Sequence, residues 1–203
     1  MYTATNFGLI NRTYDTDQQY DPKRRKTQWQ RFQHKVFQYN RESGENVQYK
    51  VLFLGRHGEG YHNVAQRFYG THDWDKLRET IGVHTCDRRS SKTYIHENYP
   101  GYTFEQGFTE NDELWVPDLR ESDSAQTKRS QELLDDIFSN DGSTFISFSS
   151  HGGEIGALLK AINHRPFGLV TGAVIPVLVK ADVLNAKPPS TMIEGPLAPL
   201  YVR

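Results

Sequence analysis

Residues 49–59 read Tyr-Lys-Val-Leu-Phe-Leu-Gly-Arg-His-Gly-Glu, a short apolar run that ends in a histidine flanked by arginine and glycine. A nearly continuous apolar run of this length is typical of a strand buried on both faces, as in a parallel sheet covered by helices. Residues 144–149 and 173–179 form two further runs of this kind. Pro176 in the third run cannot donate a backbone hydrogen bond, so we expect that strand at a sheet edge or at a bulge.

Helical patterns alternate with these strands. In residues 27–40 apolar side chains recur at i, i+3 and i+4, and Thr27 is placed to cap the N-terminus of an amphipathic helix. Residues 124–138 and 153–162 also have helical character. Strands that alternate with helices predict an α/β fold, which we expect to be a three-layer αβα arrangement around a mostly parallel central sheet.

The domain organisation follows from length and composition. A chain of 203 residues is long enough to bury one core of its own, and its only cysteine, Cys86, excludes a disulfide-linked scaffold. We expect one α/β domain over residues 27–181. An extended N-terminal arm, residues 1–26, precedes it, and a proline-rich tail, residues 182–203, follows it.

The charge balance limits the classes of partner. With 24 Lys and Arg against 25 Asp and Glu, the chain has a net charge of -1 and no overall field that attracts nucleic acid or an anionic membrane. No stretch approaches the roughly 18 apolar residues that cross a bilayer, and no secretory signal pattern is present. We therefore expect a cytoplasmic protein, with the nucleus as an alternative. The basic run 23–26 is interpreted as a solvated surface, with nuclear import or contact with a polyphosphate as alternatives.

Two of the predicted strands end in a histidine followed by glycine, as Arg56-His57-Gly58 and as Ser150-His151-Gly152. Ligands of open α/β sheets bind beyond the carboxyl ends of the strands, and glycine lets backbone amides approach an anion there. A neutral imidazole is a good nucleophile toward phosphorus at pH 7, and an arginine beside it can hold phosphoryl oxygens. The pattern predicts a phosphate site that includes both glycines.

A metal site is the competing interpretation of the histidines. His57 and His62 are five positions apart, and His84 lies near Cys86. Neither pair has the spacing of a helical zinc motif, and no carboxylate completes a set of three ligands. We expect no metal and no cofactor.

The residues Arg56-His57-Gly58-Glu59 after a buried strand, with Asn63 downstream and residues 150–154 after a late strand, resemble the histidine phosphatase superfamily, the phosphoglycerate mutase-like family. The segments LFLGRHGEGYHNVA and LRETIGVHTCDRRSSK are similar to its fungal phosphomutase-like branch. The resemblance implies that His57 is phosphorylated and that Arg56, Asn63 and His151 hold the phosphoryl group. It also implies that Glu79 protonates the leaving oxygen.

The chain departs from the family pattern in its middle. Only 21 residues separate His57 from Glu79, where the family has several tens, including a further strand and a Ser-Pro-Leu-x-Arg-like segment that supplies a second phosphate-binding arginine. We expect a fold that lacks part of the usual sheet and helices. Candidates for the missing arginine are Arg78, Arg88 and Arg89, of which the last two can equally lie in a solvated or substrate-selecting loop.

The functional prediction is a metal-independent phosphomonoester hydrolase that acts on a small phosphorylated molecule through a phosphohistidine. The alternatives are a phosphomutase and a non-catalytic, vestigial phosphate-binding protein that has lost the second arginine. A nucleic-acid-binding module that uses residues 23–26 with Tyr20 and Trp29 is a third hypothesis, and the neutral overall charge disfavours it.

Overall fold

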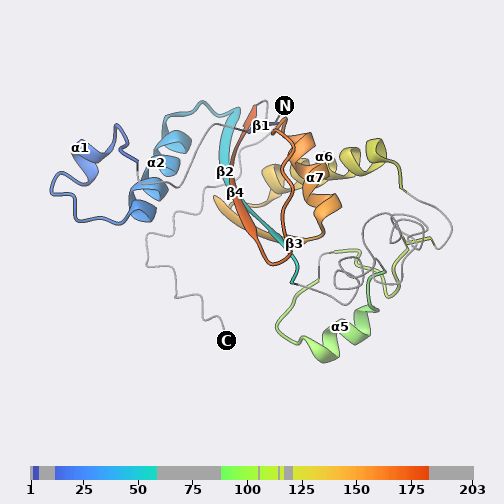
Figure 1. The fold of residues 1–203 in the computed structure, drawn as a ribbon. Coiled ribbons are helices and arrows are strands. Elements are labelled where there is room, and N and C mark those ends of the chain that lie inside the picture. Colours follow the sequence, from blue (N-terminus) through green and yellow to red (C-terminus); the bar gives the residue numbers. More distant parts are fainter. Residues whose placement is uncertain are drawn as a thin grey trace. The chain divides into compact units, whose positions relative to one another are not determined.

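A computed structural model of the chain describes residues 2–4, 12–58, 88–104, 106–113, 115–116 and 121–182 (Figure 1). The chain divides into two compact units, one within residues 1–58 and 127–203 and the other within residues 59–126. The first unit contains the β-sheet. None of the helices in the described ranges is long and apolar enough to cross a membrane.

The sheet has four strands in the order β1-β4-β2-β3. β2 (Val47–Arg56) pairs in parallel with β3 (Phe145–Ser150), and antiparallel with β4 (Val174–Asp182), which in turn pairs antiparallel with β1 (Tyr2–Ala4). The predicted α/β class is confirmed, and the two strands that end in histidine are the parallel pair. β4 runs the other way because residues 163–173 carry the chain back to the carboxyl end of β2, where Val174 lies opposite Gly55.

Pro176 occupies a place in β4 that tolerates a missing donor. The amide of Arg56 donates to the carbonyl of Ala173 at 2.9 Å, and alternation along an antiparallel ladder turns the nitrogen of Pro176 away from β2. On its other side, β4 pairs with β1 only at Val179–Ala181 within the described residues. β4 is nevertheless an inner strand, between β1 and β2, so the expected edge position is wrong; Pro176 is tolerated because its nitrogen does not face β2.

Helices cover both faces of the sheet, as predicted for a three-layer fold (Figure 1). On one face, α2 (Gln28–Glu42) buries Phe32 and Val36 against Val51 of β2 and Leu178 of β4. On the other face, α6 (Asp123–Asn140) and α7 (Gly152–Ala161) enclose the larger core. Alternate residues of β2 point to opposite faces, which explains why its apolar run is nearly continuous.

The ends of α2 follow from its sequence. Thr27 is the N-cap and forms a capping box with Gln30, so two amides that lack helical partners are satisfied. Ser43 is the C-cap, and a short turn leads into β2. Asn40 on α2 bonds the carbonyl and the amide of Tyr49 at 2.8 and 2.7 Å, and thereby holds the helix against the start of the strand.

The N-terminal segment is not extended throughout, in contrast to the predicted arm. It contains β1 and a short helix, α1 (Asp17–Tyr20), and Tyr14 is buried in the cluster beneath α2. Burial of the aromatic ring of Tyr14 in this cluster lowers the free energy of the folded chain. This burial holds the segment against α2. The tail from residue 183 onward lies outside the described residues.

β2 also carries a fully buried lysine, Lys50. Its ammonium donates to the carbonyls of Asp141 at 2.6 Å and Ser143 at 2.7 Å, directly after the C-terminus of α6. Burial lowers the pKa of Lys50 from 10.5 to about 8, and the negative charge of Asp141 opposes the shift only in part. The lysine thus ties α6 to the sheet at an electrostatic cost.

Because the pKa of Lys50 is lowered, the free energy of unfolding should change with pH in the alkaline range. Because the pKa of Lys50 is lower in the folded chain, the unfolded chain binds more protons between about pH 8 and 10.5, and stability gains from this group as pH rises. We expect the free energy of unfolding of the wild type, relative to Lys50→Met, to increase by at most about 3 kcal/mol over this interval. Urea unfolding at several pH values measures the difference.

Lys128→Met is the matched control, since the Lys128 side chain is 77% exposed and its change should leave the pH dependence intact. A constant gap between wild type and Lys50→Met from pH 7 to 10.5 would show that the buried lysine does not titrate in this range.

Candidate active site

The carboxyl ends of β2 and β3 form the candidate site, which we call the histidine edge (residues 56–58 and 150–152). Arg56 lies opposite Ser150 in the parallel register, and the amide of His57 donates to the carbonyl of Ser150 at 3.0 Å. The next residue of each strand is a histidine. The ring centroids of His57 and His151 are 4.8 Å apart, at an interplanar angle of 57°. The structure therefore brings together the two histidines that the sequence singled out.

The ring of His57 is oriented by its neighbour. Its Nδ1 lies 2.6 Å from the carbonyl oxygen of Gly58. A carbonyl oxygen only accepts hydrogen bonds, so Nδ1 carries the proton and, in the neutral ring, Nε2 carries the lone pair. Gly58 thus contributes through its carbonyl group, and Nε2 is the ring nitrogen that this hydrogen bond does not use.

Arg56 is held between two loops of the first unit. Its Nη1 donates to the carbonyl of Leu169 at 2.8 Å. A Cβ atom at Gly152 would lie 3.5 Å from both Cζ and Nε of Arg56, so the guanidinium rests against the first residue of α7. Nε is buried and has no acceptor among the described residues. Hydrogen bonds from the protein therefore do not saturate this guanidinium.

His151 is the N-cap of α7, yet its side chain makes no capping hydrogen bond. The first amides of a helix lack helical acceptors and carry a partial positive charge, which favours an anion at this end. The next two residues, Gly152 and Gly153, have no side chain to shield those amides. The histidine edge therefore combines two imidazoles, a guanidinium and a helix N-terminus, a set that suits a phosphoryl group.

Two further contacts hold the histidine edge in shape. Gly172, at φ +76°, donates its amide to the carbonyls of Arg56 at 3.1 Å and His57 at 2.9 Å. On α7, Glu154 accepts hydrogen bonds from Arg129 at 2.9 Å and from the Ser130 hydroxyl at 2.8 Å, both on α6. The first contact fixes the turn after β2, and the second fixes the turn after β3.

Sequence reasoning missed these supporting residues. Leu169 and Gly172 act through backbone groups and depend on the return of residues 163–173 to the edge, for which no side-chain pattern exists. Glu154 was visible next to the second histidine turn, and a carboxylate in the first turn of a helix is a recognised signal. Its partners on α6 could not be predicted from the sequence, because the contact depends on how α6 packs on α7.

The other predicted site residues fall outside this unit or outside the described residues. Asn63, Arg78 and Glu79 lie outside the described ranges, so their roles stay predictions. Arg88 and Arg89 belong to the second unit, which contains α5 (Lys92–Asn98).

The two arginines of the second unit have different surroundings. The guanidinium of Arg89 donates to the carbonyls of Ser90, Thr109 and Asn111, at 2.9, 3.1 and 2.6 Å, and so ties residues 89–92 to residues 108–112. The guanidinium of Arg88 lies 5.3 Å from the Trp115 ring, a cation–π distance. Among the described residues, no group of three or more His, Cys, Asp or Glu is arranged to hold a metal ion.

Comparison with known proteins identifies the class. The chain is 38% identical to a probable phosphoglycerate mutase of Arthroderma benhamiae, over 92% of this chain and 80% of that protein. It is 41% identical to the phosphomutase-like protein 3 of Candida albicans, over 55% of this chain and 36% of that protein. A probable phosphoglycerate mutase of Saccharomyces cerevisiae is 37% identical, over 54% and 42% of the two chains. No family model and no solved structure matches significantly.

The structure defines an α/β protein with two histidines directly after neighbouring parallel strands, and the comparisons assign its family. The chain belongs to the histidine phosphatase superfamily, in the phosphoglycerate mutase-like family. The alignment with the Arthroderma protein spans 268 positions, whereas the whole chain has 203 residues, so at least 65 positions of that alignment have no residue here. This difference agrees with the predicted loss of an internal block.

The hydrogen bond to Gly58 predicts the tautomer of His57. At pH 8 a long-range ¹H–¹⁵N correlation spectrum should show a protonated Nδ1 and an unprotonated Nε2 for this residue, assigned by its loss in His57→Gln. His164 is an internal reference, because its Nδ1 lies 2.7 Å from the carbonyl of Arg165 and should show the same pattern. An Nε2-protonated His57 would remove this nitrogen as the nucleophile.

Proposed function

We propose that the protein hydrolyses phosphate monoesters of small molecules through a phosphohistidine on His57. The observation that carries the proposal is the pair of imidazoles 4.8 Å apart, in which the bond from Nδ1 of His57 to Gly58 leaves Nε2 as the basic nitrogen. Membership of the phosphoglycerate mutase-like family supports the same chemistry.

The reaction has two steps. Nε2 of His57 attacks phosphorus, the bond from phosphorus to the ester oxygen breaks, and the carboxyl group of Glu79 gives its proton to that oxygen. Water then attacks the phosphohistidine, loses a proton to the Glu79 carboxylate, and releases inorganic phosphate with His57 restored. Arg56, Asn63 and His151 hold the equatorial oxygens during both steps.

The charge of the transferred group is balanced by protein groups in this scheme. Arg56 supplies a permanent cation beside Gly152, and the first turn of α7 supplies amide donors. An imidazole nucleophile also needs no metal to lower its pKa, in contrast to a water nucleophile. The proposed enzyme is therefore independent of divalent ions.

The first test is hydrolysis of p-nitrophenyl phosphate from pH 4 to 8 with a chelator present. We expect turnover in the chelator and a fall in kcat/KM of at least about a thousandfold in His57→Ala, because the covalent path is lost. His96→Ala, which changes an exposed histidine of α5, is the matched control and should keep full activity. Turnover that survives in His57→Ala would disprove the nucleophile assignment.

The second test separates the two halves of the mechanism. A p-nitrophenolate leaving group needs little help from an acid, whereas an alkoxide is strongly basic and must be protonated. We expect Glu79→Gln to lower kcat/KM for an alkyl phosphate such as glycerol 2-phosphate by about 10²–10⁴-fold, and for the aryl ester much less. Equal losses on both substrates would argue against Glu79 as the acid.

A non-catalytic phosphate-binding protein is the second candidate, and the positions of the Arthroderma alignment that have no residue in this chain favour it. Loss of one charge-assisted contact costs about 1.5–3 kcal/mol in binding, and a transition state that depends on the contact suffers more. Saturable binding of vanadate to a folded protein without turnover would support this candidate. A phosphomutase, the activity that the names of the relatives suggest, would instead move the phosphate within a substrate without releasing it.

A further inference from the structure

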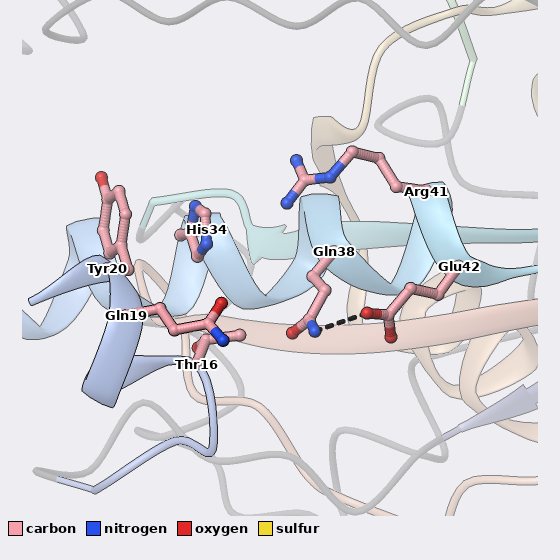
Figure 2. Close-up of a pocket in the computed structure, with 7 residues that line it drawn as sticks. All are labelled: Thr16, Gln19, Tyr20, His34, Gln38, Arg41 and Glu42. Carbon is pink, nitrogen blue, oxygen red and sulfur yellow. Dashed lines mark hydrogen bonds between the residues drawn. The ribbon is translucent and has the colours of Figure 1, made fainter.

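Two surfaces of the first unit differ in what they offer a partner. On the outer face of α2, the rings of Tyr20 and His34 stack at 3.8 Å and line a polar pocket of about 380 Å³ (Figure 2). The lining contains one guanidinium, that of Arg41, and one carboxylate, that of Glu42, so their charges cancel. The Gln38 amide already donates to this carboxylate at 2.6 Å. The outer side of β3 instead presents unpaired backbone groups.

β3 is the last strand in the sheet order β1-β4-β2-β3, and β2 is its only partner strand in the described part of the chain. The amides of Val51 and His57 donate to the carbonyls of Thr144 and Ser150, at 2.8 and 3.0 Å. Backbone groups of successive residues in a strand point to opposite sides, so the even-numbered residues of β3 bond β2. The amides and carbonyls of residues 145, 147 and 149 therefore point away from β2. They have no partner within the described residues.

The side chains of β3 are also incompletely covered. Leu52 and Leu54 of β2 are fully buried. The residues opposite them in the parallel register, Ile146 and Phe148, pack against the same core but are only partly buried. Phe145, on the face covered by α2, is partly buried as well. A further strand beside β3 would cover the apolar surface that these three side chains leave exposed.

β3 lacks the features that commonly keep an edge strand unpaired. Residues 143–150 read STFISFSS, without a charged residue, a proline or a glycine. The register of β3 with β2 continues through residues 145–150 without a bulge. Natural edge strands are usually protected by lysine, proline or a bulge, and an edge without them is a template for another strand. The predicted loss of part of the usual sheet agrees with an open edge.

We propose that β3 pairs antiparallel with β3 of a second copy of this chain, about a twofold axis at Ser147. In this register Ser147 lies opposite the partner's Ser147, and Phe145 lies opposite the partner's Ser149. Residues 145, 147 and 149 all direct their backbone groups outward, so the register joins outward groups with outward groups. Each of these opposed pairs can then exchange two hydrogen bonds, as in any antiparallel ladder.

The side chains fit the same twofold arrangement. Ile146 comes opposite the partner's Phe148, in a pair without backbone hydrogen bonds, where side chains lie closest. Both residues are partly buried, so their contact extends the apolar core across the interface. No like charges meet, because the strand has none. A foreign peptide has less to recognise, since strand addition gains specificity from side-chain pockets and the exposed side chains of β3 are those of Ser147 and Ser149.

The symmetry of the contact determines the size of the assembly. The other edge of the sheet is β1, which has three residues and offers fewer backbone bonds than β3. Pairing of β3 with the partner's β1 would be a head-to-tail contact that can continue into fibres, whereas pairing of β3 with β3 uses the same surface twice and closes at two copies. The proposal therefore predicts a dimer and no larger assembly.

The first test is the mass of the full chain by light scattering over a range of concentrations. We expect a concentration-dependent dimer of twice 23.4 kDa. Ser147→Lys places two ammonium groups opposite each other at the axis and should raise the dimer dissociation constant at least about tenfold. Ser147→Pro should weaken the dimer as well, because it removes an amide that faces the partner and none that bonds β2. Ser139→Lys, at an exposed position on α6, is the control of equal charge change and should leave the constant unchanged.

The second test is cross-linking in a Cys86→Ser background, which removes the native thiol. Ser147→Cys brings two thiols together across the axis, with Cα atoms about 5.5 Å apart, a distance that a disulfide spans. We expect a covalent dimer under mild oxidation. Ser149→Cys is the matched control, because its two copies are separated by four residues, about 13 Å along the strands, and should not cross-link.

Three results would overturn the proposal. One is a wild type with normal circular dichroism that stays a monomer at the highest concentration, which would show that the edge is open or covered by another segment of this chain. Another is a dimer whose dissociation constant is unchanged in folded Ser147→Lys and Ser147→Pro, which would place the interface elsewhere. The third is a disulfide in Ser149→Cys and none in Ser147→Cys, which would exclude the twofold register.

Discussion

The parallel pairing of β2 with β3 is the constraint on which the rest of the candidate site depends. Because Arg56 lies opposite Ser150, both strands end at the same level, and the residue that follows each one is a histidine. A shift of the register by one residue would turn every side chain of a strand to the other face of the sheet. The burial of Leu52 and Leu54 under α6 and α7 therefore also fixes the distance between the two imidazoles.

The core and the site make opposite demands on β2. Its apolar residues need cover on both faces, which α2 provides on one side and α6 with α7 on the other. Its last residues need to be free of that cover, so that a ligand can reach them. At the edge, Leu169 and Gly172 hold Arg56 and His57 through backbone groups. Lys50, near the start of β2, ties α6 to the strand through two hydrogen bonds. Its lowered pKa shows that burying this ammonium has an electrostatic cost, which the rest of the core offsets.

Most of the fold was predictable because its signals are local. Periodicity located α2, α6, α7 and the three strands, and the capping box at Thr27 determined where α2 begins. The direction of β4 was not predictable, since it depends on the path of a loop that has no pattern of its own. The same loop supplies the carbonyl that accepts a hydrogen bond from Arg56. The sequence therefore predicted that the two histidines lie together, but not which residues hold them in place. The short helix α1 was missed because four residues are too few to form a helix by themselves, and the ion pair of Asp17 with Arg31 of α2 depends on packing.

The two units divide the proposed chemistry unequally. The first unit holds His57, the guanidinium of Arg56 and the N-terminus of α7, which are the groups that the proposed mechanism uses to bind and accept a phosphoryl group. Asn63, Glu79 and the candidate arginines all belong to residues 59–126, the unit in which the sequence predicts the loss of an internal block. Phosphorylation of His57 by an ester with a good leaving group asks little of that second unit, whereas cleavage of an alkyl ester and release of the phosphate ask for its acid. In the proposed mechanism, the loss of an internal block therefore bears first on the range of substrates, because the groups proposed to bind the phosphoryl group follow two paired strands of the sheet.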